Sequence, residues 1–110
     1  MKIPPEAEIP AHKLTAYLLA PRQADDKSRF LSQAGFSLDN WEMLLEELRR
    51  LVAENEAVAD RSDEYGTFYR VEGRLSGPNG RKLEVVTIWL CVKLNQGFRF
   101  ITLKPRHARR

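Results

Sequence analysis

The spacing of apolar residues changes along this chain from a helical period to a period of two. In segment 11–19, Leu14, Tyr17 and Leu18 fall on one helical face, which predicts a short first helix. Prolines flank this segment on both sides. The first can begin a helix, and the second ends it because the residue before a proline avoids the α conformation.

Two further helices are predicted before the middle of the chain. Residues 24–36 form the second, in which Phe30 and Ala34 share a face. Gly35 suits the left-handed conformation that closes a helix. Residues 37–55 form the third helix, because they carry one long apolar stripe: Trp41, Leu44, Leu45, Leu48, Leu51 and Val52.

The ends of this third helix are also marked in the sequence. Asp39 and Glu42 have the spacing of a capping box, which predicts where the helix begins. Beyond it, residues 57–64, with the sequence AVADRSDE, are predicted to be a polar connection.

From residue 65 onward, the alternation of apolar and polar residues is typical of strands. In 65–75, one face carries Tyr69, Val71 and Leu75, and arginines and a glutamate occupy the other face. Residues 76–80, with the sequence SGPNG, predict a hairpin turn. Residues 83–92 are apolar on both faces, so we expect a central strand that is covered on both sides.

The last predicted strand covers residues 98–104. Strict alternation would place Phe98, Phe100 and Thr102 on one face and put Arg99, Ile101 and Leu103 on the other. Helices followed by antiparallel strands indicate an α+β fold, with N-terminal helices packed on a C-terminal meander of three to four strands. We divide the chain into an extended, proline-rich lead-in over 1–10, a single domain over 11–105 and a basic tail over 106–110.

Composition agrees with a globular domain. The chain has 110 residues, of which 43% are hydrophobic and 30% charged. It lacks the long apolar run of a membrane span and the apolar core of a signal peptide, so we expect a soluble, cytoplasmic protein without membrane contact. The single cysteine, Cys91, excludes an internal disulfide and is predicted to be a small buried residue.

Charge divides the chain into two unequal parts. Residues 1–64 hold 8 Lys and Arg against 13 Asp and Glu, a net charge of −5. Residues 65–110 hold 10 against 2, a net charge of +8. A basic C-terminal half favours an anionic partner such as RNA. It equally fits a half whose positive charge neutralises the acidic half.

Standard catalytic and metal-binding motifs are absent from the sequence. The turn sequence GPNG lacks the lysine and hydroxyl residue of a phosphate loop, and no Cys/His cluster or nucleophile elbow occurs. Asp25 and Asp26 fit a helix start better than a metal pair, and no third ligand accompanies them. His12 and His107 lie near the two ends, where a solvated role is the simpler interpretation. We therefore expect no metal and no cofactor.

What remains is a set of cationic and hydroxyl side chains. Such residues suit metal-independent RNA cleavage, in which Lys or Arg stabilises charge on the phosphate and a Tyr or another polar group assists proton transfer. They also suit plain phosphate binding, and they are ordinary on an exposed sheet face. The members of the set are Lys13, Lys27, Arg29, Tyr69, Arg70, Arg74, Thr87, Arg99 and Thr102.

Five stretches in the same order resemble a bacterial family known as domain of unknown function 6883. They are KLTAYLLAP (13–21), KSRFLSQAGF (27–36), YGTFYRVEGRLSGPNGR (65–81), VTIW (86–89) and FRFITLKP (98–105). The resemblance covers nearly the whole chain after the lead-in. It departs after LLAP, where family members usually continue with Asn-Pro and a His-Pro-like segment, whereas this chain reads APRQADD.

The resemblance implies a small domain with helices before a sheet. Similar domains occur beside a small partner gene and at the C-terminal tips of large secreted polymorphic toxins. That setting implies a toxin, in particular a ribonuclease of the barnase, colicin and RelE-like fold group. No catalytic assignment carries over, so the family's motif positions are places to test: Lys13, Tyr17, Lys27, Tyr69 and Trp89.

The leading hypothesis from the sequence is therefore a toxin-like, metal-independent ribonuclease with a cognate antitoxin or immunity protein as its partner. The catalytic candidates are Lys27, Tyr69, Arg99 and Thr102. The RNA-binding candidates are Lys13, Arg70, Arg74, Arg81 and Lys82. The alternative is a non-enzymatic protein-interaction module of a small two-gene system, in which the basic half only balances the acidic half. The sequence does not determine the oligomeric state.

Overall fold

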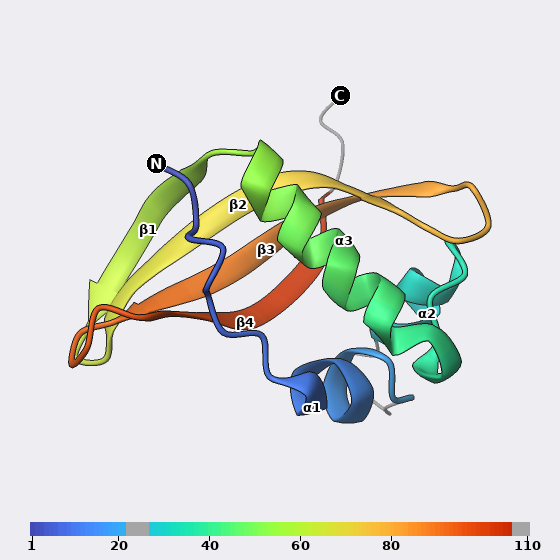
Figure 1. Cartoon of the computed structure of the whole chain (residues 1–110), viewed down its shortest axis with the longest axis horizontal. Coiled ribbons are helices and arrows are strands. Elements are labelled where there is room, and N and C mark those ends of the chain that lie inside the picture. The colour runs from blue at the N-terminus through green and yellow to red at the C-terminus, as the bar shows by residue number, and fades with distance from the viewer. Residues whose placement is uncertain (22–26, 107–110) are drawn as a thin grey trace.

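The computed structural model describes residues 1–21 and 27–106, and it places helices before a four-stranded antiparallel sheet (Figure 1). The α+β prediction is confirmed, and the sheet order is β1-β2-β3-β4. In chain order the elements are α1 (Ala11–Lys13), the π-helical turn η1 (Leu14–Leu18), α2 (Lys27–Ser32), the 3-10 turn η2 (Leu38–Asn40), α3 (Trp41–Glu54), β1 (Ala57–Asp63), β2 (Gly66–Ser76), β3 (Lys82–Val92) and β4 (Phe98–Pro105).

The first strand corrects the prediction of a polar connection over 57–64. Ala57–Asp63 is an edge strand that pairs with β2 from Ala57↔Val71 to Asp63↔Gly66, with an irregularity between Ala59 and Arg61. Only its first residue is buried. An edge strand with one buried side chain shows no alternation of apolar and polar residues, so the period-two signal was missing.

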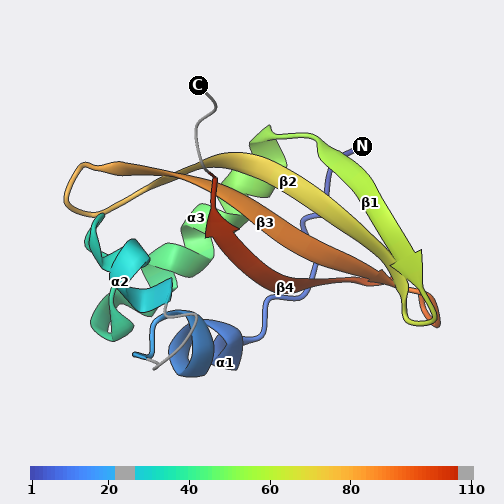
Figure 2. The same ribbon diagram turned by 180° about the vertical axis from the view of Figure 1, so that it is seen from behind.

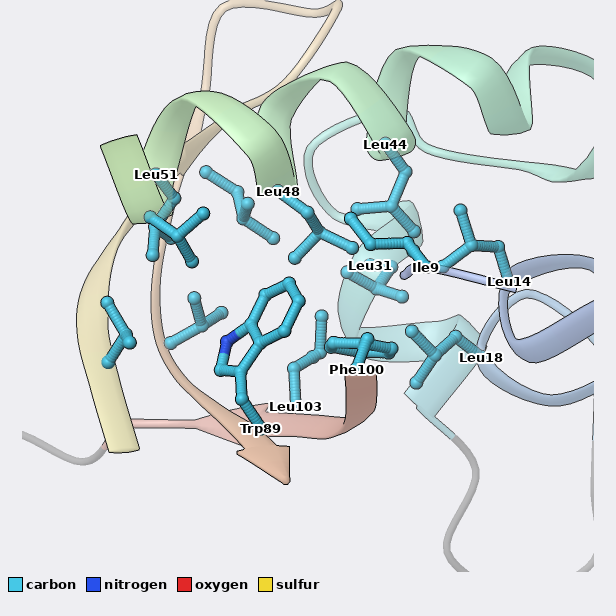
Figure 3. Close-up of a cluster of buried hydrophobic side chains, with 14 of the residues drawn as sticks. Ile9, Leu14, Leu18, Leu31, Leu44, Leu48, Leu51, Trp89, Phe100 and Leu103 are labelled. Carbon is cyan, nitrogen blue, oxygen red and sulfur yellow. The ribbon is translucent and has the colours of Figure 1, made fainter. Parts of the chain in front are cut away.

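The hydrophobic core lies between α3 and one face of the sheet. Figure 1 shows α3 crossing this face diagonally. Trp89 is fully buried at the centre, and its ring meets Phe100 edge-on with 5.3 Å between ring centroids. Figure 3 shows the buried side chains around it, which α3, α2, η1 and β4 supply: Leu44, Leu48, Leu51, Leu31, Leu14, Leu18, Leu103 and Phe100.

The second face of the sheet corrects another expectation. Residues 83–92 were predicted to be covered on both sides, yet the described helices lie on one face and beyond the β4 edge, and Figure 2 shows the other face of the sheet uncovered. On that face, Val86 is buried while Ile88 and Leu90 are partly exposed.

A register shift in β4 decides which way its side chains point. Trp89 pairs with Phe100 and Ile88 pairs with Thr102, so Ile101 is an extra residue in β4. Leu103 therefore enters the core, and Thr102 lies on the uncovered face. The predicted grouping of Thr102 with Phe100 was wrong, because strict alternation cannot pass through a bulge.

The lead-in protects the free edge of β4. Glu8 accepts a hydrogen bond from the Phe100 N–H and donates its own N–H to the Phe98 carbonyl, both at 2.8 Å. The lead-in also places three apolar residues in the core: Ile3, Ala7 and Ile9. This cover satisfies backbone groups that an open edge would leave available for another chain.

The free part of the β2 edge, beyond its pairing with β1, is protected by α3. Arg50 donates to the Arg74 carbonyl at 2.8 Å, and Glu47 accepts the Ser76 N–H at 2.7 Å. Glu47 and Arg50 also bind each other at 2.8 Å. Burial of the Glu47 carboxylate opposes its ionisation, but the hydrogen bonds from Arg50 and the Ser76 N–H outweigh burial and lower the pKa of Glu47.

Three local predictions have mixed outcomes. Gly35 does adopt the left-handed conformation, with φ +94°. The capping box belongs to Ser37 and Asn40 at the start of η2, two residues earlier than the predicted pair. Cys91 is partly exposed rather than buried, because it lies near the end of β3.

Among the described residues, no helix has the length and apolar character of a membrane span.

Among the described residues, Thr87 is the one buried polar side chain, and its hydroxyl both donates and accepts a hydrogen bond. Thr87 is completely buried on the core face of β3. Its Oγ1 donates to the Val71 carbonyl at 2.9 Å and accepts the Trp89 Nε1–H at 2.8 Å. The hydroxyl therefore allows the indole N–H to be buried without loss of its hydrogen bond. This role in the core explains why a hydroxyl residue occupies position 87.

We predict that Thr87→Val destabilises the fold although it keeps the volume of the side chain. The substitution leaves the Trp89 indole N–H without its acceptor, which costs about 1–3 kcal/mol. Thr87→Ser, which keeps the hydroxyl and loses one methyl group, should cost only about 1 kcal/mol. Urea denaturation followed by tryptophan fluorescence measures both. Equal stability of Thr87→Val and the wild type would contradict this account.

A second prediction concerns Glu47. Because the pKa of Glu47 is lowered in the folded state, its carboxylate stabilises the fold above the ordinary value of 4.5, and this contribution is lost as the pH falls through the lowered pKa. Glu47→Gln should therefore lose roughly 0.5–1.5 kcal/mol at pH 7. The difference from wild type should shrink below about pH 4.5, as denaturation curves from pH 7 to pH 3 will show. A constant difference across that range would refute the role of the charge.

Candidate functional site

Hydroxyl and ammonium groups gather where α1, η1 and α2 meet the edge of β4. The Tyr17 hydroxyl lies 3.2 Å from Thr102 Oγ1, and Lys27 Nζ donates to the Tyr17 hydroxyl at 3.3 Å. These groups come from η1, β4 and the first residue of α2, and Tyr17 is 85 positions away from Thr102. Together with Lys13, these residues form what we call the Tyr17 cluster: Lys13, Tyr17, Lys27 and Thr102.

Two positive charges lie against the aromatic ring of this cluster. Lys13 Nζ is 5.8 Å and Lys27 Nζ 5.5 Å from the centroid of the Tyr17 ring, both within the range of a cation–π contact. Two ammonium groups beside a pair of hydroxyl groups can stabilise negative charge on a bound phosphate. The hydroxyl groups can also donate or accept a proton.

Lys13 has a structural contact as well. Its Nζ donates to the Ile101 carbonyl at 3.0 Å, at the extra residue of the β4 bulge. Within residues 1–21 and 27–106, no carboxylate lies within 4.0 Å of Lys13. The bulge therefore holds the lysine by its own carbonyl while it turns Thr102 toward Tyr17.

The other two catalytic candidates lie outside the cluster. Tyr69 pairs with Trp89 across β2 and β3, and its ring packs on Phe98 with 5.4 Å between centroids. Its side chain is therefore on the core face, opposite to Thr102. Arg99 shares the uncovered face with Thr102, and its Nε lies 4.0 Å from a Glu8 carboxylate oxygen. The structure thus brings Lys27 and Thr102 together and leaves Tyr69 and Arg99 apart from them.

Most of the predicted RNA-binding residues are paired with acids or lie at the β2–β3 hairpin. Arg70 lies 3.8 Å from an Asp60 oxygen and 3.6 Å from a Glu72 oxygen. Arg74 binds Glu84. Arg81 and Lys82 are exposed where the β2–β3 hairpin enters β3.

A pocket of about 520 Å³ lies beside the free edge of β2, where some of these cations meet. It does not resemble an anion site, because acids alternate with the cations that line it. The charged lining residues are Arg50, Arg74, Lys82 and Arg106 with Glu54, Glu72 and Glu84.

The sequence named Tyr17 only as a motif position and as part of an apolar stripe. A tyrosine on an apolar helical face is predicted to be a core residue. The hydroxyl group that Tyr17 contacts belongs to Thr102 in β4, so this contact is not visible in the helical pattern. His12 is exposed in α1, next to Lys13 in the chain. Asp25, Asp26 and His107 lie outside the described residues. Among the described residues, no group of three or more His, Cys, Asp or Glu side chains could hold a metal ion.

Comparison with solved structures gives a fold relative. One chain of a contact-dependent growth inhibition toxin–immunity protein complex from Klebsiella pneumoniae 342 superimposes with a TM-score of 0.69. The two chains share 19% sequence identity, and the likeness covers 94% of this chain and 96% of the other. At that identity the likeness establishes a common fold. No curated protein matches the sequence.

Family membership follows from the sequence itself. The model for Domain of unknown function (DUF6883) matches residues 4–107, which include residues 4–10 of the lead-in, all described helices and all four strands. The resemblance seen in the ordered sequence stretches is thereby confirmed, and this chain belongs to the DUF6883 family.

Proposed function

We propose that this domain is a toxin-like, metal-independent ribonuclease and that the Tyr17 cluster is its active site. The observation that carries the proposal is the contact of the Tyr17 hydroxyl with both Lys27 Nζ and Thr102 Oγ1, with a second ammonium group over the same ring. The fold shared with a chain of a toxin–immunity complex supports a toxin-like role.

The reaction needs proton transfer and charge stabilisation. In metal-independent cleavage, the ribose 2′-hydroxyl oxygen attacks phosphorus and loses its proton to a base. The bond from phosphorus to the 5′-oxygen breaks, that oxygen takes up a proton, and a 2′,3′-cyclic phosphate remains. Tyr17 and Thr102 supply hydroxyl groups for proton transfer, and Lys13 and Lys27 stabilise the charge on the non-bridging oxygens.

A cognate immunity protein is the partner that this proposal requires. A ribonuclease made inside a cell must be blocked until it reaches its target, and the structural relative was solved as a toxin–immunity complex. We therefore propose a protein partner that silences the domain, encoded next to it.

A second candidate function, a non-enzymatic interaction module, is favoured by one specific feature. Tyr65 and Leu94 are 65% and 92% exposed at the tips of two hairpins. These tips are adjacent, because the Lys93 N–H donates to the Tyr65 carbonyl at 2.8 Å. Exposed apolar side chains at such a site suit protein contact rather than phosphate chemistry.

We predict that Tyr17→Phe and Lys27→Met each lower RNA cleavage about 100-fold or more, because each removes one proton-transfer or charge-stabilising group. The measurement is cleavage of end-labelled total RNA by purified domain with EDTA present, which should leave the wild-type rate unchanged. Induced expression should arrest growth in the wild type and not in these variants.

Matched controls separate chemistry from folding. Lys93 is an exposed lysine in the β3–β4 turn, so the Lys93→Met variant should cleave RNA at the wild-type rate. Circular dichroism must show that the Tyr17 and Lys27 variants are folded. Wild-type protein that leaves RNA intact, or folded cluster variants that cleave as fast as Lys93→Met, would reject the ribonuclease. Tyr65→Ser and Leu94→Ser variants that lose only partner binding would then favour the interaction module.

A further inference from the structure

The uncovered face of the sheet carries apolar side chains along its middle. Phe68 and Leu90 are paired across β2 and β3, and Val86 and Ile88 continue the line along β3. Val86 is buried and the other three are partly exposed. We call these four residues the apolar stripe. Figure 2 shows the strands that bear it, with no described helix in front of them.

The two sides of the stripe differ in charge. On the β4 side, Leu90 pairs with Arg99, Ile88 with Thr102 and Val86 with Lys104, so a line of cationic and hydroxyl groups runs beside the stripe. Lys104 has no carboxylate within 4.0 Å among the described residues. On the β2 side, the arginines alternate with Glu72 and are paired with acids.

The β4 line leads directly to the Tyr17 cluster, because Thr102 belongs to both. An anionic chain laid along β4 would pass Lys104, Thr102 and Arg99 with the lysines of the cluster at its side. The stripe residues of β3 then lie one strand spacing away, about 4.8 Å, and Phe68 on β2 lies one further spacing beyond them. This arrangement places phosphate contacts and apolar contacts in parallel rows.

At one end of the apolar stripe, the Phe68 ring and the Arg61 side chain form a platform on which bases could stack. The Arg61 guanidinium carbon lies 4.3 Å from the centroid of the Phe68 ring. Aromatic rings and guanidinium planes are the side chains on which unpaired bases stack. Arg61 also extends the platform toward β1, beyond the apolar stripe.

We infer that this face binds single-stranded RNA, with phosphates along β4 and unpaired bases over the apolar stripe. The inference rests on the proposed ribonuclease function and names the class of its substrate. A duplex offers its phosphates and hides its base faces, so an apolar row beside the cations would gain nothing from it. A single strand exposes base faces that the stripe can cover.

Binding measured without cleavage tests this inference. The probe is a fluorescent single-stranded RNA oligonucleotide, and the same oligonucleotide annealed to its complement is the duplex competitor. Both are titrated into Tyr17→Phe protein to limit cleavage. We expect tighter binding of the single strand. Phe68→Ala should weaken it roughly 5- to 100-fold, the effect of losing one base–aromatic stack, and should leave duplex binding unchanged.

Three further variants distinguish loss of stacking from loss of charge and from loss of folding. Phe68→Leu keeps apolar bulk and folding but removes the ring, so it should weaken single-strand binding too. Lys104→Ala should weaken both RNA forms and reduce the salt dependence by about one ion. Met43→Ala changes an exposed apolar residue of α3 and should have no effect.

The outcomes separate this inference from the proposed function. RNA cleavage by wild type with equal binding of both RNA forms, or with binding unaffected by Phe68→Ala and Phe68→Leu, overturns the inference and leaves the ribonuclease standing. Stripe-dependent single-strand binding without cleavage supports the inference and rejects the ribonuclease. No RNA binding, with a protein partner on this face instead, overturns both.

Discussion

The packing of α3 on one face of a twisted antiparallel sheet is the constraint on which the rest of this structure depends. Trp89 lies at its centre, fully buried beneath α3 and edge-on to Phe100. Its indole N–H can be buried there because the Thr87 hydroxyl accepts a hydrogen bond from it and donates one to the Val71 carbonyl. The core thereby fixes the face to which β3 and β4 turn their large side chains, and the opposite face is left for other uses.

Different contacts protect the free edge of β4 and the free part of the β2 edge. The lead-in pairs with β4 through Glu8, Lys13 binds the carbonyl at the β4 bulge, and Glu47 with Arg50 binds the free part of β2. Each contact satisfies backbone groups that would otherwise invite a strand from another chain. At β4 the protection has a consequence for function, because the elements that cover the edge also bring the Tyr17 cluster to it.

Some cations of the sheet are paired with acids and others are not. This difference decides which of them are available to bind a phosphate. Arginines of β2 lie next to acids of β1, β2 and β3, whereas Lys104 of β4 and Lys13 of the cluster have no carboxylate within 4.0 Å among the described residues. Exposed ion pairs contribute about 0–1 kcal/mol each, so those of β2 neutralise charge more than they stabilise the fold. The net charge of +8 that the sequence assigns to residues 65–110 is therefore less available than its total suggests.

The helices, the strands β2, β3 and β4 and the α+β order could all be predicted from the sequence, because burial of one face imposes a period of 3.6 or 2 on apolar residues. It could not determine β1, in which only Ala57 is buried, nor the face of Thr102, which a single extra residue in β4 reverses. It proposed Lys27 and Thr102 as site residues from their chemistry but had no means of joining them to Tyr17. That contact spans 85 positions and depends on where a helix meets a strand edge, so only the tertiary structure decided it.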